Sequence, residues 1–197
     1  MTNLVFIPVK DQLPNPLTIY DPACGSGGML TESQDFITDP EGEVKAKVGV
    51  FLYGKEVNPE TYAICKSDMM IKGNNPENIR VGSTLSTDEF AGTTFDFMLS
   101  NPPYGKSWAS ELKYIKDGKD IFDPRFQIKL KDYWGTVEEA DATPRSSDGQ
   151  LLFLMEMVNK MKTLKQSPLG TRIASVHNGS SLFTGDAGGG ESNIRRY

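Results

Sequence analysis

The chain has one histidine and two cysteines among its 197 residues, and this scarcity excludes several kinds of site. His177, Cys24 and Cys65 fall in none of the spacings by which zinc is bound, so we expect no metal centre. Two cysteines also cannot form the disulfide framework that stabilises small secreted domains. We therefore expect a reduced, cytoplasmic environment.

Long apolar runs and excess positive charge are also missing. No run of about 18 apolar residues occurs, so we expect no membrane span, and the N-terminus lacks the layout of a secretory signal. The formal net charge is −5, whereas a protein that binds DNA on its own usually carries a basic face. If nucleic acid is the substrate, a partner chain or a further segment supplies most of the affinity.

Strand and helix patterns alternate along the sequence. Strands are indicated at 17–21, 48–56, 95–100 and 171–177. Helical patterns cover 27–38, 58–73 and 148–164, with Asn58 and Asp148 as candidate caps and Gly73 as a helix stop. This order is typical of an α/β fold, a mostly parallel sheet covered by helices on both faces. In such sheets ligands bind at the carboxyl ends of the strands.

The length suits one domain, which we expect to span residues 1–197. Residues 104–147 interrupt the alternation, because they mix aromatic and charged residues without a clear period. A connection of that length in a compact domain is usually functional or mobile. We interpret it as a long loop or an insertion within the domain.

The segment "DPACGSGGML" follows the first predicted strand and opens a helix. Gly25, Gly27 and Gly28 allow a sharp turn and a close approach of the backbone to a ligand, beside the free amides of a helix N-terminus. A dinucleotide loop of the form G-x-G-x-x-G requires a third glycine where this chain has Leu30. Hydride transfer with a nicotinamide cofactor is therefore disfavoured.

Glu56 closes the next predicted strand, 28 residues after Gly28. A carboxylate at that position can accept hydrogen bonds from both hydroxyls of a ribose. A glycine loop without the dinucleotide pattern, together with a ribose-binding acid, describes an adenosine-containing ligand that has no pyrophosphate. S-adenosylmethionine fits this description.

The segment "NPPYG" follows the buried strand pattern "FDFMLS". Prolines cannot extend a strand, so Pro102 and Pro103 form a stiff corner at the carboxyl end of the sheet. The side-chain carbonyl of Asn101 and the main-chain carbonyl of Pro102 are two acceptors that would localise the lone pair of an exocyclic amine toward a methyl donor. Tyr104 offers a flat face on which a flipped-out base can stack.

The sequence resembles a known family from about residue 17 to its end. The matching segments are "DPACGSGGML", "GKEVNPETYAICKSDMMIKG", "NIRVGSTL", "FDFMLSNPPYGK", "SSDGQLLFLMEMVNKMK" and "RIASVHNGSSLFTGDAGGGESNIRR". In this order they are similar to the methylase subunits of type I restriction-modification systems, which are DNA adenine N6-methyltransferases using S-adenosylmethionine. The resemblance implies a class I methyltransferase fold, also called Rossmann-like.

The resemblance assigns roles to particular residues. It implies that Asp21, Pro22, Ala23, Gly25, Ser26, Gly27 and Gly28 bind the cofactor, largely at its methionine end. Glu56 would hold the ribose, and Ser83 would lie near the cofactor's adenine, where the family often has an acidic residue or asparagine. Catalysis would rest on Asn101, Pro102, Pro103 and Tyr104, which grip the target adenine.

The sequence departs from the family at both ends. Members normally carry a helical N-terminal domain and an F-Y-T-P-like segment over the cofactor, neither of which is found in "MTNLVFIPVKDQLPNP". Further strand and helix would be expected after "IRRY". We therefore expect a catalytic core truncated at both ends, whose isolated activity is not assured. The family's partners are DNA, a specificity subunit that reads the sequence, and a restriction (motor) subunit.

Two alternatives stay open at this point. A protein-glutamine methyltransferase would use the same Asn–Pro–Pro–Tyr segment on an amide substrate. A methylase-like module retained only for assembly would have the same fold without binding cofactor.

Overall fold

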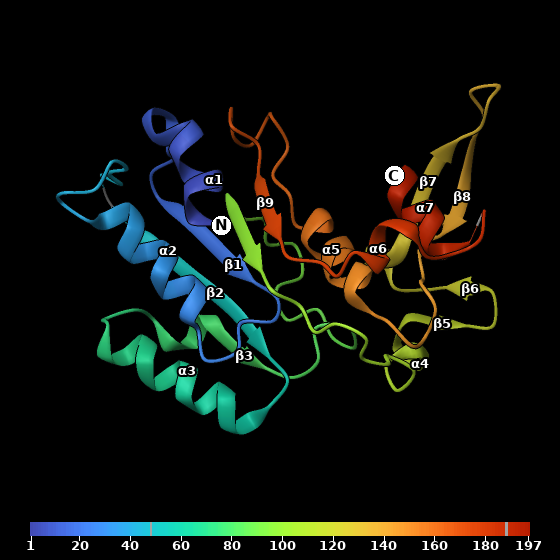
Figure 1. Cartoon of the computed structure of the whole chain (residues 1–197), viewed down its shortest axis with the longest axis horizontal. Coiled ribbons are helices and arrows are strands. Elements are labelled where there is room, and N and C mark those ends of the chain that lie inside the picture. The colour runs from blue at the N-terminus through green and yellow to red at the C-terminus, as the bar shows by residue number, and fades with distance from the viewer. Residues whose placement is uncertain (48, 188) are drawn as a thin grey trace. The chain divides into compact units, whose positions relative to one another are not determined.

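The strand pattern "LTIYD" forms β1 (Leu17–Asp21), the middle strand of a five-stranded sheet. In the computed structural model, which describes residues 1–47, 49–187 and 189–197, the strand order is β3-β2-β1-β4-β9 (Figure 1). Every neighbouring pair in this sheet is parallel, which confirms the predicted sheet. The chain leaves β1 toward β2 on one side and later returns to β4 on the other. This reversal is the switch point at which such sheets bind ligands.

The described residues form two compact units. The first unit comprises Met1–Thr84, Glu89–Asn101 and Lys160–Val176, and the second comprises Leu85–Asp88, Pro102–Asn159 and His177–Tyr197. The sheet belongs to the first unit. The expectation of one catalytic core over 1–197 stays a prediction.

The first unit contains the long helices that follow β1 and β2. Its elements are α1 (Thr2–Phe6), the 3₁₀ turn Ile7–Gln12, β1, α2 (Gly28–Thr38), β2 (Val50–Glu56), α3 (Pro59–Ile71), the 3₁₀ turn Pro76–Asn78, β3 (Ile79–Val81), β4 (Phe97–Ser100) and β9 (Arg172–Ser175). The predicted strand over 48–56 thus begins at Val50, and Val48 lies outside the described residues.

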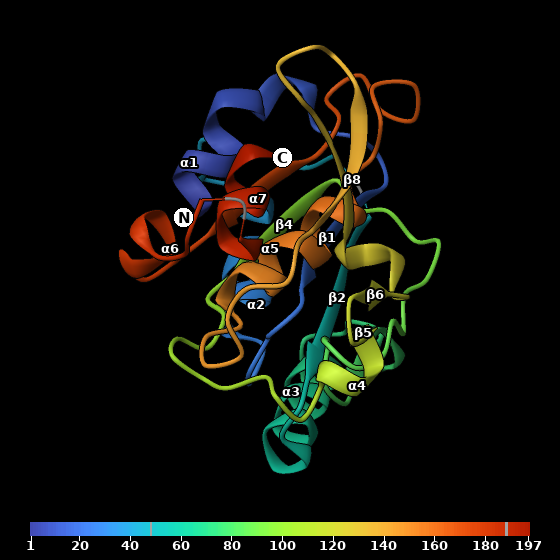
Figure 2. The same cartoon turned by 90° about the vertical axis from the view of Figure 1, so that its right-hand side faces the viewer.

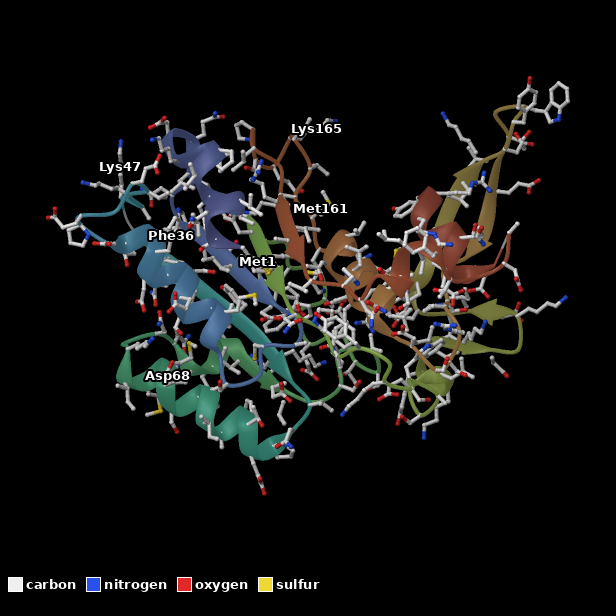
Figure 3. All side chains as sticks on the ribbon, viewed as in Figure 1. Met1, Phe36, Lys47, Asp68, Met161 and Lys165 are labelled. Atoms are coloured by element: carbon white, nitrogen blue, oxygen red, sulfur yellow. The ribbon has the colours of Figure 1, made fainter. Side chains whose placement is uncertain are left out.

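Helices α1, α2 and α3 cover one face of this sheet. Phe36 of α2 lies beside α1, where its ring centroid is 6.3 Å from that of Phe6 (Figure 3). Phe6 in turn lies 4.6 Å from Phe97 of β4, centroid to centroid. Because side chains alternate along a strand, Ile19 and Leu52 also point into this core.

The opposite face of β1 and β2 carries aromatic side chains. Tyr20 stacks on Phe95 with 4.5 Å between ring centroids, and Tyr53 packs against both Phe90 and Phe95. The loop that precedes β4 therefore closes this face of the first unit. Such aromatic pairs add about 0.5–1.5 kcal/mol each beyond the area they bury.

The predicted helix signals of α3 are confirmed. The side chain of Asn58 accepts hydrogen bonds from the amides of Glu60 and Thr61, and Pro59 occupies the first helical position. Gly73 follows the helix with φ of +75°, the left-handed conformation that ends helices. Local sequence therefore decides where α3 begins and ends.

The second unit has its own core and two small antiparallel hairpins. Its elements are α4 (Leu112–Ile115), β5 (Lys116–Asp117), β6 (Asp120–Ile121), the 3₁₀ turn Pro124–Phe126, β7 (Gln127–Lys131), β8 (Val137–Asp141), α5 (Gln150–Asn159), α6 (Ser180–Phe183) and α7 (Gly190–Arg196). Figure 2 shows the β7–β8 ribbon extending beyond α7. The buried guanidinium of Arg125 forms ion pairs with two carboxylates, 2.6 Å from Oδ2 of Asp123 and 3.0 Å from Oε2 of Glu156.

The stretch 104–147 thus contains α4 and both hairpins, although its sequence has no clear period. Its role as an insertion stays a prediction. In the described part of the chain, no helix is long and apolar enough to cross a membrane.

Candidate active site

Asp21 ends β1 and begins the glycine loop. Its side chain is 2% exposed, and its Oδ1 accepts hydrogen bonds from the amide of Ala23 (2.9 Å) and the hydroxyl of Ser100 (2.8 Å). Burial and, to a smaller extent, the nearby charge of Glu56 raise the pKa of Asp21, the two hydrogen bonds lower it, and the net result is a pKa of about 7. A buried carboxyl that changes charge near neutral pH is a common feature of functional sites.

The glycine loop turns where the sequence predicts it to turn. Gly25 and Gly27 have φ of +56° and +90°, which side chains rarely adopt. A Cβ on Gly27 would lie 2.8 Å from Sγ of Cys65 and 2.9 Å from Cε of Met69, so α3 packs directly against the loop. Gly28 is different: it is the exposed first residue of α2, and a Cβ there would meet nothing within 4 Å.

The part of the loop around Cys24 packs against β2. The amide of Cys24 donates to the carbonyl of Lys55 at 3.0 Å, and Cys24 packs on Gly54, where a Cβ would lie only 2.8 Å from its Sγ. Pro22 is buried, whereas Ser26 at the tip of the loop is exposed. The loop therefore presents backbone and Ser26 outward and buries its apolar side.

Glu56 ends β2 beside this loop. Its Oε2 accepts from the amide of Gly25 at 3.0 Å, and its Oε1 accepts from the amide of Asn58 at 2.7 Å. One carboxylate therefore fixes both the glycine loop and the start of α3. Each oxygen has a further lone pair, so the carboxylate can still accept from ligand hydroxyls.

Ser83 lies in the turn after β3, at the same edge of the sheet. Its neighbour Gly82 donates its amide to the carbonyl of Glu56 at 2.9 Å. On its other side, the hydroxyl of Thr84 donates to the carbonyl of Pro22 at 2.5 Å. These two bonds bring the Ser83 backbone next to both Glu56 and the glycine loop.

The proline corner begins directly after β4. Strand β4 ends at Ser100, and residues 101–104 form neither helix nor strand, which confirms that the prolines end the strand. Asn101 is exposed and belongs to the first unit, whereas Pro102, Pro103 and Tyr104 belong to the second. Pro102 is buried, Pro103 is exposed, and Tyr104 is 40% exposed.

Hydrogen bonds within the first unit thus bring together Asp21, the glycine loop, Glu56 and the Ser83 turn. Asn101 follows directly after Ser100, whose hydroxyl is bonded to Asp21. Ser100 and Thr84 were not predicted. The sequence signal for Ser100 is that a polar residue ends the apolar run "FMLS". The signal for Thr84 is its position beside Ser83 in "GSTL". Among the described residues, no cluster of three or more His, Cys, Asp or Glu is placed to hold a metal ion.

The chain is similar to known methylases along its whole length. A family model described as N-6 DNA methylase matches residues 4–197. The HindI methylase subunit of a type I restriction enzyme from Haemophilus influenzae is 32% identical over 164 residues, which cover 82% of this chain and 31% of that protein. The MjaIX methylase subunit from Methanocaldococcus jannaschii is 30% identical over 115 residues, 58% of this chain and 19% of that protein. The chain spans about a third or less of the length of these relatives.

Solved structures agree with this likeness. The methyltransferase subunit of a type I restriction-modification system from Streptococcus thermophilus matches 99% of this chain and 35% of its own, with 26% identity and a TM-score of 0.67. A protein from Listeria monocytogenes assigned to the class I S-adenosylmethionine-dependent methyltransferases has 14% identity and a TM-score of 0.56. The match covers 92% of this chain and 45% of the Listeria chain, and it supports the fold alone.

Proposed function

Because the chain belongs to the N-6 DNA methylase family, we propose that it is the catalytic core of a DNA adenine N6-methyltransferase, the modification subunit of a type I restriction-modification system. The observation that carries the proposal is the Glu56 carboxylate, which holds the glycine loop in place at the switch point of the sheet. With this carboxylate beside it, the loop suits an adenosine-containing ligand rather than a dinucleotide.

S-adenosylmethionine is the cofactor that this family and fold imply, and the residues present fit it. The space over Gly25 and Gly28 is open, since a Cβ at either position meets nothing within 4 Å. Asp21 and Glu56 each accept a hydrogen bond from an amide of this loop, at Ala23 and Gly25, and two carboxylates against the loop suit a cationic ligand that also carries a ribose. We assign Asp21 to the ammonium of the methionine end, Glu56 to the ribose hydroxyls and Ser83 to the adenine side.

The cofactor supplies an electrophilic methyl group on a sulfonium when bound. The chain's part is to hold the amine that receives it. The side-chain carbonyl of Asn101 and the main-chain carbonyl of Pro102 accept hydrogen bonds from the amine, which turns its lone pair toward the methyl group. Pro103 keeps this corner rigid, and stacking on Tyr104 contributes about 1–3 kcal/mol, comparable to the cost of flipping a base.

The proposed partners follow from the relatives and from charge. With a net charge of −5, the chain has little attraction of its own for phosphates, so a specificity subunit would supply most of the DNA affinity. A restriction (motor) subunit would complete the complex. We expect the protein to act on this DNA in the cytoplasm.

Calorimetric titration with S-adenosylmethionine tests the cofactor site. We expect the 197-residue chain to bind, Asp21→Ala to lose binding, and the exposed-site control Asp11→Ala to bind as the wild type does. Absence of binding by a wild-type chain that unfolds cooperatively on heating would contradict the proposal and favour a module retained only for assembly.

Methyl transfer tests the substrate. With a specificity subunit present, labelled methyl should enter adenine in duplex DNA. Asn101→Ala should bind cofactor normally but lower the transfer rate by about 10²–10³, as removal of one preorganised polar group does in other enzymes. Label found in a protein glutamine instead of DNA would support the protein methyltransferase.

A further inference from the structure

Ser100 connects two parts of the proposed site. Its hydroxyl is fully buried within the sheet and donates to Oδ1 of Asp21 at 2.8 Å. The same oxygen accepts from the amide of Ala23, the bond that closes the first turn of the glycine loop. One carboxylate oxygen therefore joins the start of the cofactor loop to the residue directly before Asn101.

This link lies beyond the paired part of β1 and β4. The two strands are in register at Ile19 with Phe97 and at Tyr20 with Met98. On its other side β4 is paired to its end, where Ser100 aligns with Ser175 and its carbonyl accepts from the amide of Val176. The backbone of Ser100 is thus fixed by β9, and its side chain reaches toward β1.

We propose that Ser100 is a positioning residue for methyl transfer: its hydroxyl fixes the Asp21 carboxylate toward the cofactor's ammonium and sets the end of β4, and hence Asn101, against the glycine loop. The inference rests on the proposed function and adds to it a residue to which no role has been assigned. Ser100 acts through Asp21 and Asn101 and does not touch the reacting atoms.

The charge state of Asp21 supports this role. Burial raises the pKa of Asp21 and hydrogen bonds from Ala23 and Ser100 lower it, which leaves it at about 7. The charge of Glu56 on β2 raises the pKa of Asp21. The thiols of Cys24 and Cys65 also lie close enough to Asp21 to interact with its charge. Without the Ser100 hydroxyl, less Asp21 would be ionised at neutral pH to meet a cation.

Cofactor affinity at several pH values tests the proposal. We expect Ser100→Ala to bind S-adenosylmethionine about tenfold more weakly than wild type at pH 6 and by a clearly smaller factor at pH 9, where Asp21 is ionised in both and only the lost positioning remains. The matched control is Ser33→Ala, which removes a fully buried hydroxyl bonded within α2, 2.7 Å from the carbonyl of Met29. A serine that only fills space would lower the affinity by the same factor at every pH, and that result would overturn the proposal.

A second measurement does not depend on cofactor binding. In the chain alone, the carboxyl carbon of Asp21 can be titrated by NMR with labelled aspartate. Ser100→Ala should move its midpoint upward, Ser33→Ala should not, and an unchanged midpoint in Ser100→Ala would overturn the link. If the wild type binds no cofactor, the proposed function fails, and this titration still decides the Ser100 contact. Ser100→Cys, with a weaker donor of similar size, replaces Ser100→Ala if the latter does not fold.

Discussion

The carboxylate of Glu56 and the amide of Gly25 are joined by a hydrogen bond of 3.0 Å between strand β2 and the glycine loop. The two residues are 31 positions apart, and the bond closes the switch point of the sheet. The other oxygen of Glu56 accepts from the amide of Asn58 at 2.7 Å. Glu56 therefore shapes the site in addition to any contact with a ribose.

Glu56→Gln should weaken cofactor binding by at least about tenfold. The new amide NH₂ faces one of the two backbone amides, so one hydrogen bond to a charged acceptor is lost and two donors oppose each other. Titration calorimetry measures the change. The control is Glu60→Gln, an exposed carboxylate in the first turn of α3. Equal affinity of Glu56→Gln and wild type would show that the loop does not depend on this bond.

Gly27→Ala and Gly28→Ala should separate stability from binding. A Cβ on residue 27 would collide with Cys65 and Met69, and an alanine there would have to adopt the φ of +90° that Gly27 has. We therefore expect Gly27→Ala to lower the free energy of unfolding by about 3 kcal/mol. Gly28 is helical with open space around it, so alanine should leave stability unchanged or raise it by up to about 1 kcal/mol.

Cofactor titration completes the comparison of the two glycines. The methyl group of Gly28→Ala would enter the space that we assign to the ligand, so this stable variant should bind S-adenosylmethionine poorly. Unaltered binding by Gly28→Ala would place the ligand elsewhere. Urea denaturation of both variants supplies the stability values.

The strands and the helices around the glycine loop could be predicted because local signals decide them. The strand predicted at 17–21 is β1, and the helix predicted at 58–73 agrees with α3 and its Asn58 cap. The helical pattern over 148–164, in contrast, ends at Asn159. Lys160 lies in a turn and Met161 forms a parallel bridge with Phe95, whose amide donates to the Lys160 carbonyl at 3.1 Å, so a tertiary contact overrides the local pattern.

The residues of the candidate site could be proposed from the sequence, but the hydrogen bonds that connect them could not. The order of the glycine loop, Glu56 and the Asn101 corner indicates a common edge, because parallel strands end together. Nothing in the sequence pairs Ser100 with Asp21 or Thr84 with Pro22, since those bonds depend on the packing of strand ends. The three-residue strand β3 was also missed, because so short a segment has no measurable period.

Asp96→Asn should destabilise the sheet at the end away from the site. The buried carboxylate accepts from the amide and hydroxyl of Thr18 at 3.0 and 2.8 Å, and from Nζ of Lys162 at 2.6 Å. Removing the charge leaves Lys162 without its ionic partner, at a cost of about 3 kcal/mol. Urea denaturation checks this value, with the exposed Asp11→Asn as control. A loss below about 0.5 kcal/mol would mean that the amide replaces the carboxylate without penalty.

Asp21→Asn should make the chain more stable at neutral pH while it abolishes cofactor binding. The carboxyl has its ordinary pKa of 3.8 in the unfolded chain and a pKa of about 7 in the folded one. Between these values the folded state keeps a proton that the unfolded state releases, so the free energy of unfolding falls as pH rises from about 4 to about 7. Asparagine has no proton to lose, and its carbonyl can still accept from Ala23 and Ser100.

The difference between Asp21→Asn and wild type should therefore grow across this window, from about 0.5 kcal/mol at pH 4 to about 4 kcal/mol above pH 7. Urea denaturation at pH 4, 5.5, 7 and 8 measures it, with the exposed Asp11→Asn as the control. A difference that stays constant with pH would mean that Asp21 is not held at a raised pKa. A growing difference, together with lost S-adenosylmethionine binding, would indicate that the fold tolerates a destabilising buried charge because the bound cation stabilises it.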